Sequence, residues 1–322
     1  MGLRIAHSDS SQIRCGIVLS AGNGVRLRDY VSRLRGYHLP KQYVNFVGKR
    51  SMLEHTFHRA EKLIPAEQLY VIIDKEHLQL GDVRRQTATR SPATVVIQPE
   101  NKGTAVGILL SLSYLHRRYP EAAVVFLPSD HFILEEDLFV RYVDLAFRAV
   151  EHDGSRLVLL GAEASEAALD YGYIVPGEEL KSFGAAGVKK IELFVEKPGL
   201  EAAKKLINIG ALLNMFVIVS KVATLLDVFQ RTTPELYHAF QPILHAIGTA
   251  VKDQVVKGVY QHIQPFDFST SVLESLPFEY RQTLLALPVK GITWSDWGSE
   301  NRVLKVAQKI GQVNRQVGFV IV

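Results

Sequence analysis

The sequence predicts an α/β fold with a mostly parallel sheet, because short apolar runs alternate with helical patterns along most of its 322 residues. A second observation points the same way: several of the apolar runs end abruptly in polar loops that contain glycine or proline. In a parallel sheet the carboxyl ends of the strands lie along one edge, where the ligands of open α/β folds bind. The sequence therefore predicts a ligand site at that edge.

The first predicted strand starts at Ile13 and leads into a small-residue loop, Ala21-Gly22-Asn23-Gly24-Val25-Arg26, which basic residues follow up to Pro40-Lys41-Gln42. Small residues beside fixed cations are typical of polyphosphate sites. Neither of two common phosphate loops fits: Leu27 stands where the dinucleotide fingerprint needs a third glycine, and no Gly-Lys-Ser/Thr triplet follows. Taken alone, the loop is better explained as an ordinary strand-to-helix turn. A bound triphosphate would explain why basic residues gather here, and a solvated basic loop is the alternative for the outer arginines.

The next predicted unit is a helix followed by a strand. The helix is predicted over Ser51–Lys62, because Leu53, Phe57 and Ala60 recur on one side, and the strand over Leu69–Ile73. Strands connected by crossover helices are the repeating unit of a doubly wound sheet.

Two further predicted strands end in polar loops. Val95–Gln98 is followed by the loop Pro99–Gly103, after which an apolar helix begins at Thr104, and Ala122–Leu127 stops at Pro128–His131. Together with the first strand, three predicted strands therefore bring polar residues to the same edge of the sheet.

The second half of the chain continues the alternation in a more antiparallel form. Its predicted elements are strands at Arg156–Gly161, Tyr171–Gly177, Lys189–Glu196 and Val289–Trp294, and a helix from Leu200 to about Asn208. The second and third of these strands are expected to pair with each other, and the proline and glycine breaks between elements are short turns rather than flexible linkers.

Six motifs occur in the order found in nucleotide-sugar pyrophosphorylases. They are Gly22-x-Gly24-x-Arg26-Leu27, Pro40-Lys41-Gln42, Gln98-Pro-Glu-Asn-Lys-Gly-Thr-Ala105, Pro128-Ser-Asp-His131, Val195-Glu-Lys-Pro198 and Trp294-Ser-Asp-Trp-Gly-Ser299. Over about residues 13–305 the chain resembles the mannose-1-phosphate guanylyltransferase branch of this family. The resemblance implies a three-layer, Rossmann-like α/β fold of the nucleotide-diphospho-sugar transferase type, with a mostly parallel mixed sheet.

The resemblance also implies an activity, the transfer of a nucleoside monophosphate from a nucleoside triphosphate to a sugar 1-phosphate with release of pyrophosphate. GTP and mannose 1-phosphate, which would give GDP-mannose, are the expected substrates, because the segment Glu100–Ala105 resembles the guanylyl branch. Two alternatives stay open. The enzyme could use glucose 1-phosphate or another base, or the chain could be a catalytically silent subunit that binds a nucleotide sugar and regulates a partner.

The resemblance assigns roles to individual residues. The catalytic residues are expected to be Arg26, Lys41 and Asp130; the nucleotide-binding residues Ala21, Gly22, Gly24, Gln98, Asn101, Gly103 and Thr104; the sugar-phosphate-binding residues Gly172, Glu196, Lys197 and Asn214; and the Mg²⁺ ligands Asp130 and Asp296. The expected reaction needs cations to neutralise phosphate oxygens and hard carboxylate oxygens to hold Mg²⁺, and it needs no side-chain nucleophile.

Several positions depart from the family pattern. Ala21 stands where a second glycine is common, Val25 where threonine is common, and Leu213 where tryptophan usually precedes the asparagine. The segment between Leu27 and Pro40 is also longer than usual. These differences leave the main charges in place but leave the identity of the sugar open.

The implied domain organisation is a single nucleotidyltransferase domain over residues 1–322. It would consist of a nucleotide-binding half (13–135), a sugar-phosphate-binding half (136–305) and a short C-terminal segment (306–322) with no full β-helix domain. The apolar end of the chain, Val317–Val322, is expected to pack as a last strand, with a partner surface as the alternative.

Composition narrows the classes of partner. Lys plus Arg exceed Asp plus Glu by 37 − 33 = 4, an excess too small and dispersed to indicate nucleic acid binding. The longest apolar stretch, near residues 210–226, is interrupted by Asn214 and Lys221, which argues against a membrane span. Small-molecule substrates are therefore the expected partners, with a homo-oligomer left open.

The sequence also indicates a compartment. Residues 1–12 lack the hydrophobic block of a secretory signal, and the single Cys15 excludes an intrachain disulfide and suits a reducing environment. We therefore expect a cytoplasmic enzyme.

Overall fold

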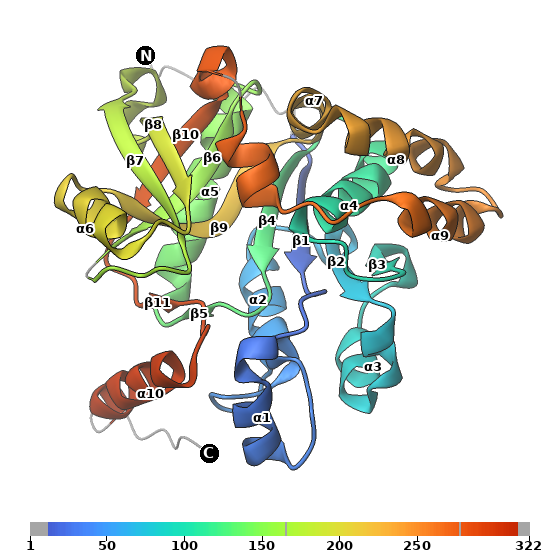
Figure 1. The fold of residues 1–322 in the computed structure, drawn as a ribbon, viewed down its shortest axis with the longest axis horizontal. Helices are drawn as coiled ribbons and strands as arrows, with labels where there is room; N and C mark the ends of the chain where they lie inside the picture. The colour runs from blue at the N-terminus through green and yellow to red at the C-terminus, as the bar shows by residue number, and fades with distance from the viewer. Residues whose placement is uncertain (1–11, 165, 277, 315–322) are drawn as a thin grey trace, which may run out of the picture.

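The computed structural model describes residues 12–164, 166–276 and 278–314 (Figure 1). Within them, nine strands form one sheet. In spatial order these strands are β3 (Val95–Gln98), β2 (Leu69–Asp74), β1 (Arg14–Leu19), β4 (Ala123–Pro128), β9 (Leu212–Lys221), β6 (Leu157–Glu163), β10 (Leu284–Val289), β8 (Lys189–Glu196) and β7 (Gly172–Glu179). The residues outside the three ranges include the predicted C-terminal apolar segment Val317–Val322.

The directions of the strands confirm a mixed, mostly parallel sheet. The strands β3, β2, β1 and β4 pair parallel with one another, as β6 and β10 do. All pairings of β9 and β8 are antiparallel, so these two strands run opposite to the other seven. As predicted, β7 and β8 are antiparallel neighbours.

Helices pack on both faces of the sheet and complete three layers. On one face lie α2 (Met52–Ala60) and α5 (Glu136–His152), and on the other lie α4 (Thr104–Arg118), α7 (Val222–Thr232), α8 (Pro234–Ala246) and α9 (Lys252–His262). Side chains of β4 alternate between the two cores, since Val125 and Leu127 belong to one and Val124 and Phe126 to the other. The predicted three-layer fold is confirmed.

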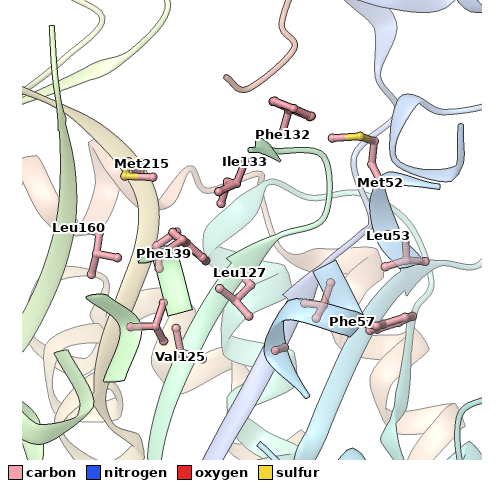
Figure 2. Close-up of a cluster of buried hydrophobic side chains, with 14 of the residues drawn as sticks. Met52, Leu53, Phe57, Val125, Leu127, Phe132, Ile133, Phe139, Leu160 and Met215 are labelled. Atoms are coloured by element: carbon pink, nitrogen blue, oxygen red, sulfur yellow. The ribbon is translucent and has the colours of Figure 1, made fainter. Parts of the chain in front are cut away.

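The core on the α2 and α5 face lies directly behind the carboxyl end of β4. Figure 2 shows Val125 and Leu127 of β4 between side chains of the two helices, among them Phe57 and Phe139, all of which are buried. This packing anchors the strand that leads into the motif Pro128–His131, so the polar residues that follow start from a rigid base.

The predicted helix after Ser51 is present as α2, and a cap that sequence reasoning did not use fixes its start. Ser51 caps α2 in a capping box: its hydroxyl accepts a hydrogen bond from the Glu54 backbone N–H at 3.1 Å, and its own N–H donates to the Glu54 carboxylate at 2.7 Å. The remaining helices are α1 (Arg28–Arg35), α3 (Gly81–Thr87), α6 (Leu200–Asn208) and α10 (Glu300–Asn314). The helix α6 has the predicted bounds. The helix α1 was not predicted and lies in the basic segment between Leu27 and Pro40.

One predicted strand, Val289–Trp294, is wrong. The strand β10 ends at Val289, and Gly291, with a φ of 73°, turns the chain out of the sheet. The chain then forms β11 (Trp294–Ser295), which pairs antiparallel with β5 (Phe132–Ile133). This glycine turn places the residues after Ser295 beside those after β4.

The carboxyl ends of the parallel strands face one side of the molecule. Figure 1 shows β1 and β4 pointing toward the side on which α1, α10 and the β5–β11 ribbon lie. Strands from both predicted halves join the one sheet, and α10 extends across residue 305, so the proposed division into halves and a tail stays a prediction. None of the helices described here has the length and apolar character needed to cross a membrane.

Candidate active site

A cavity of about 280 Å³ opens at the carboxyl edge of the sheet. Most of the predicted site residues line it: Ala21, Gly22, Gln98, Asn101, Gly103, Thr104, Asp130, Gly172, Glu196, Asn214 and Asp296. A second cavity of about 260 Å³ is lined by Gly24, Arg26, Lys41 and Asp130. Asp130 lines both cavities, which are therefore adjacent, while Lys197 lines neither.

The loop after β1 is held in shape by the motif that contains Lys41. The Gln42 side-chain amide donates to the backbone carbonyls of Ser20 at 3.0 Å and Gly22 at 2.7 Å. Gly24 has a φ of 59°, and a Cβ there would lie 3.0 Å from the backbone nitrogen of Lys41. Only glycine allows this approach without strain, which explains the second glycine of the loop.

Lys41 is a buried cation between the two predicted metal ligands. Its ammonium group lies 3.0 Å from an oxygen of Asp130 and donates at 2.6 Å to the backbone carbonyl of Asp296. Only 8% of the residue is exposed, so this charge is little screened by solvent. The contact joins the loop after β4 to the loop after β11.

Arg26 is more exposed and lies within an acidic group. Its guanidinium is 2.5 Å from Asp170 and 3.5 Å from Asp296, and 56% of the side chain is accessible. A side chain with this exposure can exchange its carboxylate partner for a phosphate without crossing the core.

The Asp296 carboxylate is oriented by three donors on a single oxygen. Its Oδ1 accepts hydrogen bonds from the Tyr171 hydroxyl at 2.5 Å, the Arg302 guanidinium at 2.9 Å and the Gly298 N–H at 3.0 Å. Burial raises the pKa of Asp296, but the bond from Tyr171 and the charges of Lys41 and Arg302 outweigh burial, so the net pKa is lowered. Asp296 is therefore an anion at neutral pH.

Asp130 and Asp296 fit Mg²⁺ as a pair of ligands rather than as a complete cage. The described residues contain no cluster of three or more His, Cys, Asp or Glu side chains that could hold a metal ion. Mg²⁺ commonly binds through one or two carboxylates plus phosphates and water, so two aspartates at the cavity match that chemistry. Lys41 contacts only Oδ2 of Asp130, and the three donors to Asp296 all contact its Oδ1. The Oδ2 atom of Asp296 has only Arg26 near it, at 3.5 Å.

The neighbouring His131 is held neutral by its surroundings. Burial lowers its pKa to about 4 against the opposing charges of Asp130 and Asp296. Its Nδ1 accepts a hydrogen bond from the Trp294 indole at 3.2 Å. These contacts give His131 a packing role behind the site.

The predicted base-binding residue Gln98 lines the main cavity at the end of β3. The residue is 1% exposed, its Nε2 is 3.5 Å from Asp74, and its Oε1 has no hydrogen-bond partner. An unpaired buried acceptor is costly, so a ligand that donates to it would gain affinity. Asn101 donates to the Ala21 carbonyl at 3.3 Å and thereby links this loop to the first one.

The loop that ends at Gly103 is pressed against the segment before residue 269. The Gly103 φ is 91°, the Ala105 N–H donates to the Phe266 carbonyl at 3.1 Å, and the Thr104 hydroxyl donates to Asp267 at 3.1 Å. A Cβ on Gly103 would overlap the Phe266 carbonyl oxygen and lie 2.8 Å from its carbonyl carbon. Glycine is therefore required on two independent grounds.

We expect Gly103→Ala to lower the free energy of unfolding by about 1–3 kcal/mol, because it adds an overlap and places alanine at positive φ. Urea titration measures the effect. Gly258→Ala in α9, where no atom lies within 4 Å of the added methyl group, serves as the control and should keep or slightly increase stability. Equal stability of the two variants would contradict the close approach at Gly103.

Three of the four predicted sugar-phosphate-binding residues, Gly172, Glu196 and Asn214, also line the main cavity. A Cβ on Gly172 would lie 2.6 Å from Oε2 of Glu196, so this glycine makes room for the carboxylate. Burial raises the pKa of Glu196, and its Oε2 has no hydrogen-bond partner. Lys197, with a φ of 46°, places its ammonium 3.2 Å from the other oxygen. The Asn214 side-chain oxygen accepts from the Phe216 N–H at 3.0 Å.

Sequence reasoning missed His77, which braces the first loop. Its Nε2 lies 3.0 Å from the Asn23 side-chain oxygen, and its Nδ1 lies 3.2 Å from the Tyr43 hydroxyl, which in turn donates to the Ser20 carbonyl at 2.9 Å. No local motif marks this histidine, because its partners lie 54 and 34 residues away.

Burial lowers the pKa of His77 below its ordinary value of 6.5, so the unfolded chain binds this proton first as the pH falls. The contribution of neutral His77 to the free energy of unfolding is therefore lost as the pH falls below about 6.5. We expect His77→Gln to reduce the difference in unfolding free energy between pH 7 and pH 5, measured by urea titration, with exposed His245→Gln as the control. An unchanged pH difference in His77→Gln would be the contrary result.

Sequence reasoning also missed Asp170 and Arg302. Arg302 contacts both Asp170 and Asp296, and Asp170 contacts Arg26. The only sequence signals were that Asp170 lies two positions before the predicted sugar-binding residue Gly172, and that Arg302 follows Ser299, the last residue of the sixth motif, by three positions.

Comparison of the sequence with known families matches residues 15–313 to the nucleotidyl transferase family. A xanthan biosynthesis protein, XanB, from Xanthomonas campestris is 27% identical over 95% of this chain and 62% of its own length. A mannose-1-phosphate guanylyltransferase from Sinorhizobium fredii is 25% identical over 89% of this chain and 54% of its own length. The chain thus spans less than two thirds of these curated relatives.

Solved structures with the same fold include two proteins of related description. A crystal structure titled mannose-1-phosphate geranyltransferase, from Thermus thermophilus, matches with a TM-score of 0.75 at 22% identity, over 90% of this chain and 79% of that one. A putative glucose-1-phosphate thymidylyltransferase from Bacillus anthracis matches with a TM-score of 0.56 at 15% identity, over 95% of this chain and 97% of that one. At these identities the likeness concerns the fold.

Proposed function

Because the chain belongs to the nucleotidyl transferase family, we propose that it transfers a nucleoside monophosphate from a nucleoside triphosphate to a sugar 1-phosphate, with release of pyrophosphate. We further propose GTP and mannose 1-phosphate as its substrates and GDP-mannose as its product. The names of several relatives and the guanylyl-like segment Glu100–Ala105 support this choice.

The observation that carries the proposal is the position of Lys41. Its buried ammonium pairs with Asp130, which lines both cavities, and donates to the backbone of Asp296, which lines the main one. The main cavity is lined both by Gln98, a predicted base-binding residue, and by Glu196, a predicted sugar-binding residue, so one cavity offers polar groups for a base and for a sugar.

In the proposed reaction a phosphate oxygen of the sugar 1-phosphate attacks the α-phosphorus in line. The new O–P bond forms as the bond to pyrophosphate breaks, and negative charge moves onto the leaving group. Lys41 and Arg26 neutralise phosphate oxygens, Arg26 by leaving Asp170. The Glu196 carboxylate accepts hydrogen bonds from sugar hydroxyls, and Lys197 beside it binds the sugar phosphate.

Asp130 and Asp296 would hold Mg²⁺ at the same edge. When bound, the ion neutralises charge on the phosphates and fixes their geometry. Protein residues hold both carboxylates in place: Lys41 pairs with Asp130, and Tyr171 and Arg302 hydrogen-bond to Asp296. A cytoplasmic location is part of the proposal and rests on the single, buried Cys15.

The proposed function is tested by measuring pyrophosphate release from the four nucleoside triphosphates combined with mannose, glucose and galactose 1-phosphates, with and without Mg²⁺. We expect metal-dependent release that is largest with GTP and mannose 1-phosphate. Release with a different pair would correct the substrates, whereas binding without release for every pair would contradict the activity and favour a regulatory subunit.

A further inference from the structure

Arg302, in the first turn of α10, contacts two neighbouring parts of the active site. Its guanidinium holds both oxygens of Asp170, at 2.9 and 2.5 Å, and donates at 2.9 Å to Oδ1 of Asp296. The same group lies over the ring of Tyr171, 4.6 Å from its centre. Both terminal nitrogens of the planar guanidinium donate to Asp170, and one of them also donates to Asp296. The guanidinium therefore has little freedom to rotate.

These contacts decide which oxygen of Asp296 is free. Oδ1 accepts from Arg302, from the Tyr171 hydroxyl and from the Gly298 N–H. Oδ2 is left with Arg26 at 3.5 Å. Arg302 acts on this arrangement directly, through its bond to Oδ1, and indirectly, through its contact with the Tyr171 ring.

Arg302 also balances the charge of Asp170 when Arg26 is needed elsewhere. In the structure both arginines pair with Asp170, Arg26 at 2.5 Å to one oxygen and Arg302 to both. If Arg26 moves to a phosphate, the grip of Arg302 keeps Asp170 paired. Without Arg302, Asp170 would hold Arg26 more firmly. The negative charges of Asp170 and Asp296 would also repel each other more, because the cation that pairs with both would be absent.

We propose that Arg302 is a positioning residue that sets the orientation of the Asp296 carboxylate for a divalent cation and frees Arg26 from Asp170 for the triphosphate. This inference rests on the proposed function. Arg302 touches neither cation nor phosphate in this role; it acts through Asp296, Tyr171 and Asp170.

The contacts of Arg302 are not needed to hold α10 against the rest of the protein. The helix α10 is already anchored by Val303, Val306 and Ile310, which belong to the core shared with α2 and α5. A separate ion pair, Lys305 with Glu166 at 3.1 Å, joins the same helix to the segment before Asp170. This exposed pair provides a matched control, because its loss removes a cation from α10 without touching Asp296.

The test compares wild type, Arg302→Met, Arg302→Lys and Lys305→Met as full-length chains. Binding of Mn²⁺, alone and with GTP, is measured from the electron paramagnetic resonance signal of the free ion, thermal unfolding reports folding, and steady-state kinetics give kcat and KM. For Arg302→Met we expect about tenfold weaker Mn²⁺ binding and about 10- to 100-fold lower kcat. We expect Arg302→Lys to recover only part of the loss, because it restores the charge but not the fork, and Lys305→Met to match wild type.

Three results would overturn the inference. Arg302→Met could bind Mn²⁺ as tightly as wild type, Lys305→Met could lose as much affinity as Arg302→Met, or the wild type could fail to bind Mn²⁺. If the wild type binds Mn²⁺ and Arg302→Met does not, yet no substrate pair releases pyrophosphate, the proposed function fails and the positioning role stands. If the wild type turns over and Arg302→Met keeps its metal affinity, the positioning role fails alone.

Discussion

Replacing Lys41 with methionine is expected to lower kcat/KM by about 10³-fold, the scale of losing a fixed cation at a reacting phosphate. The Lys41 ammonium is buried, 3.0 Å from Asp130 and 2.6 Å from the Asp296 carbonyl, so no water or neighbouring side chain replaces it easily. Methionine keeps most of the volume of the side chain and removes only the charge.

Two further variants separate loss of charge from loss of structure. Lys41→Arg keeps the charge in a larger group, and Arg33→Gln removes an exposed cation of α1 that pairs with Glu300 at 2.6 Å. We expect Lys41→Arg to fold and to retain part of the activity, and Arg33→Gln to be nearly unchanged. Full activity of a folded Lys41→Met, confirmed by its thermal unfolding, would remove Lys41 from the proposed machinery.

The second large effect is expected for Asp296→Asn. The amide has nearly the shape of the carboxylate but removes the charge that faces Arg26, Arg302 and the proposed cation. We expect turnover to fall by about 10²-fold or more, with a higher Mg²⁺ requirement, because one of two carboxylate ligands is lost. Single-turnover kinetics across a series of Mg²⁺ concentrations measure both effects.

The same variant distinguishes an enzyme from a nucleotide-sugar sensor. An enzyme loses turnover while calorimetry still detects binding of GDP-mannose, whose contacts with Gln98 and Glu196 would be unaffected. Serine at position 299 gives a control, since Ser299→Ala changes the same loop without altering its charge. Wild-type turnover in Asp296→Asn would show that this carboxylate takes no part in catalysis.

Much of the fold could be predicted because its signals are local. Leu53, Phe57 and Ala60 recur on the buried side of α2, and Leu200–Asn208 shows its helical pattern within its own residues. The polar residues that follow β1, β3 and β4 could also be placed, because these strands are parallel and their carboxyl ends lie at one edge. The prediction of a strand at Val289–Trp294 failed because Gly291, at positive φ, turns the chain between Val289 and Ile292.

The site residues that could not be predicted from the sequence depend on contacts between distant segments. Asp170 and Arg302 are separated by 132 residues, and their pairing follows from where α10 docks rather than from either local sequence. Similarly, His77 braces the first loop through partners in two other segments. A single sequence shows that such residues are charged or titratable, but not which carboxylate or loop they meet.

The most direct test of the proposed activity follows the phosphorus atoms of GTP. The full-length chain is incubated with mannose 1-phosphate and Mg²⁺ and with GTP labelled at either the α- or the γ-phosphorus, and the products are separated by chromatography. We expect the α-label in a nucleotide sugar and the γ-label in pyrophosphate, both only when metal is present. Release of the γ-label as orthophosphate, or GTP that binds and stays intact, would contradict nucleotidyl transfer from GTP to this sugar.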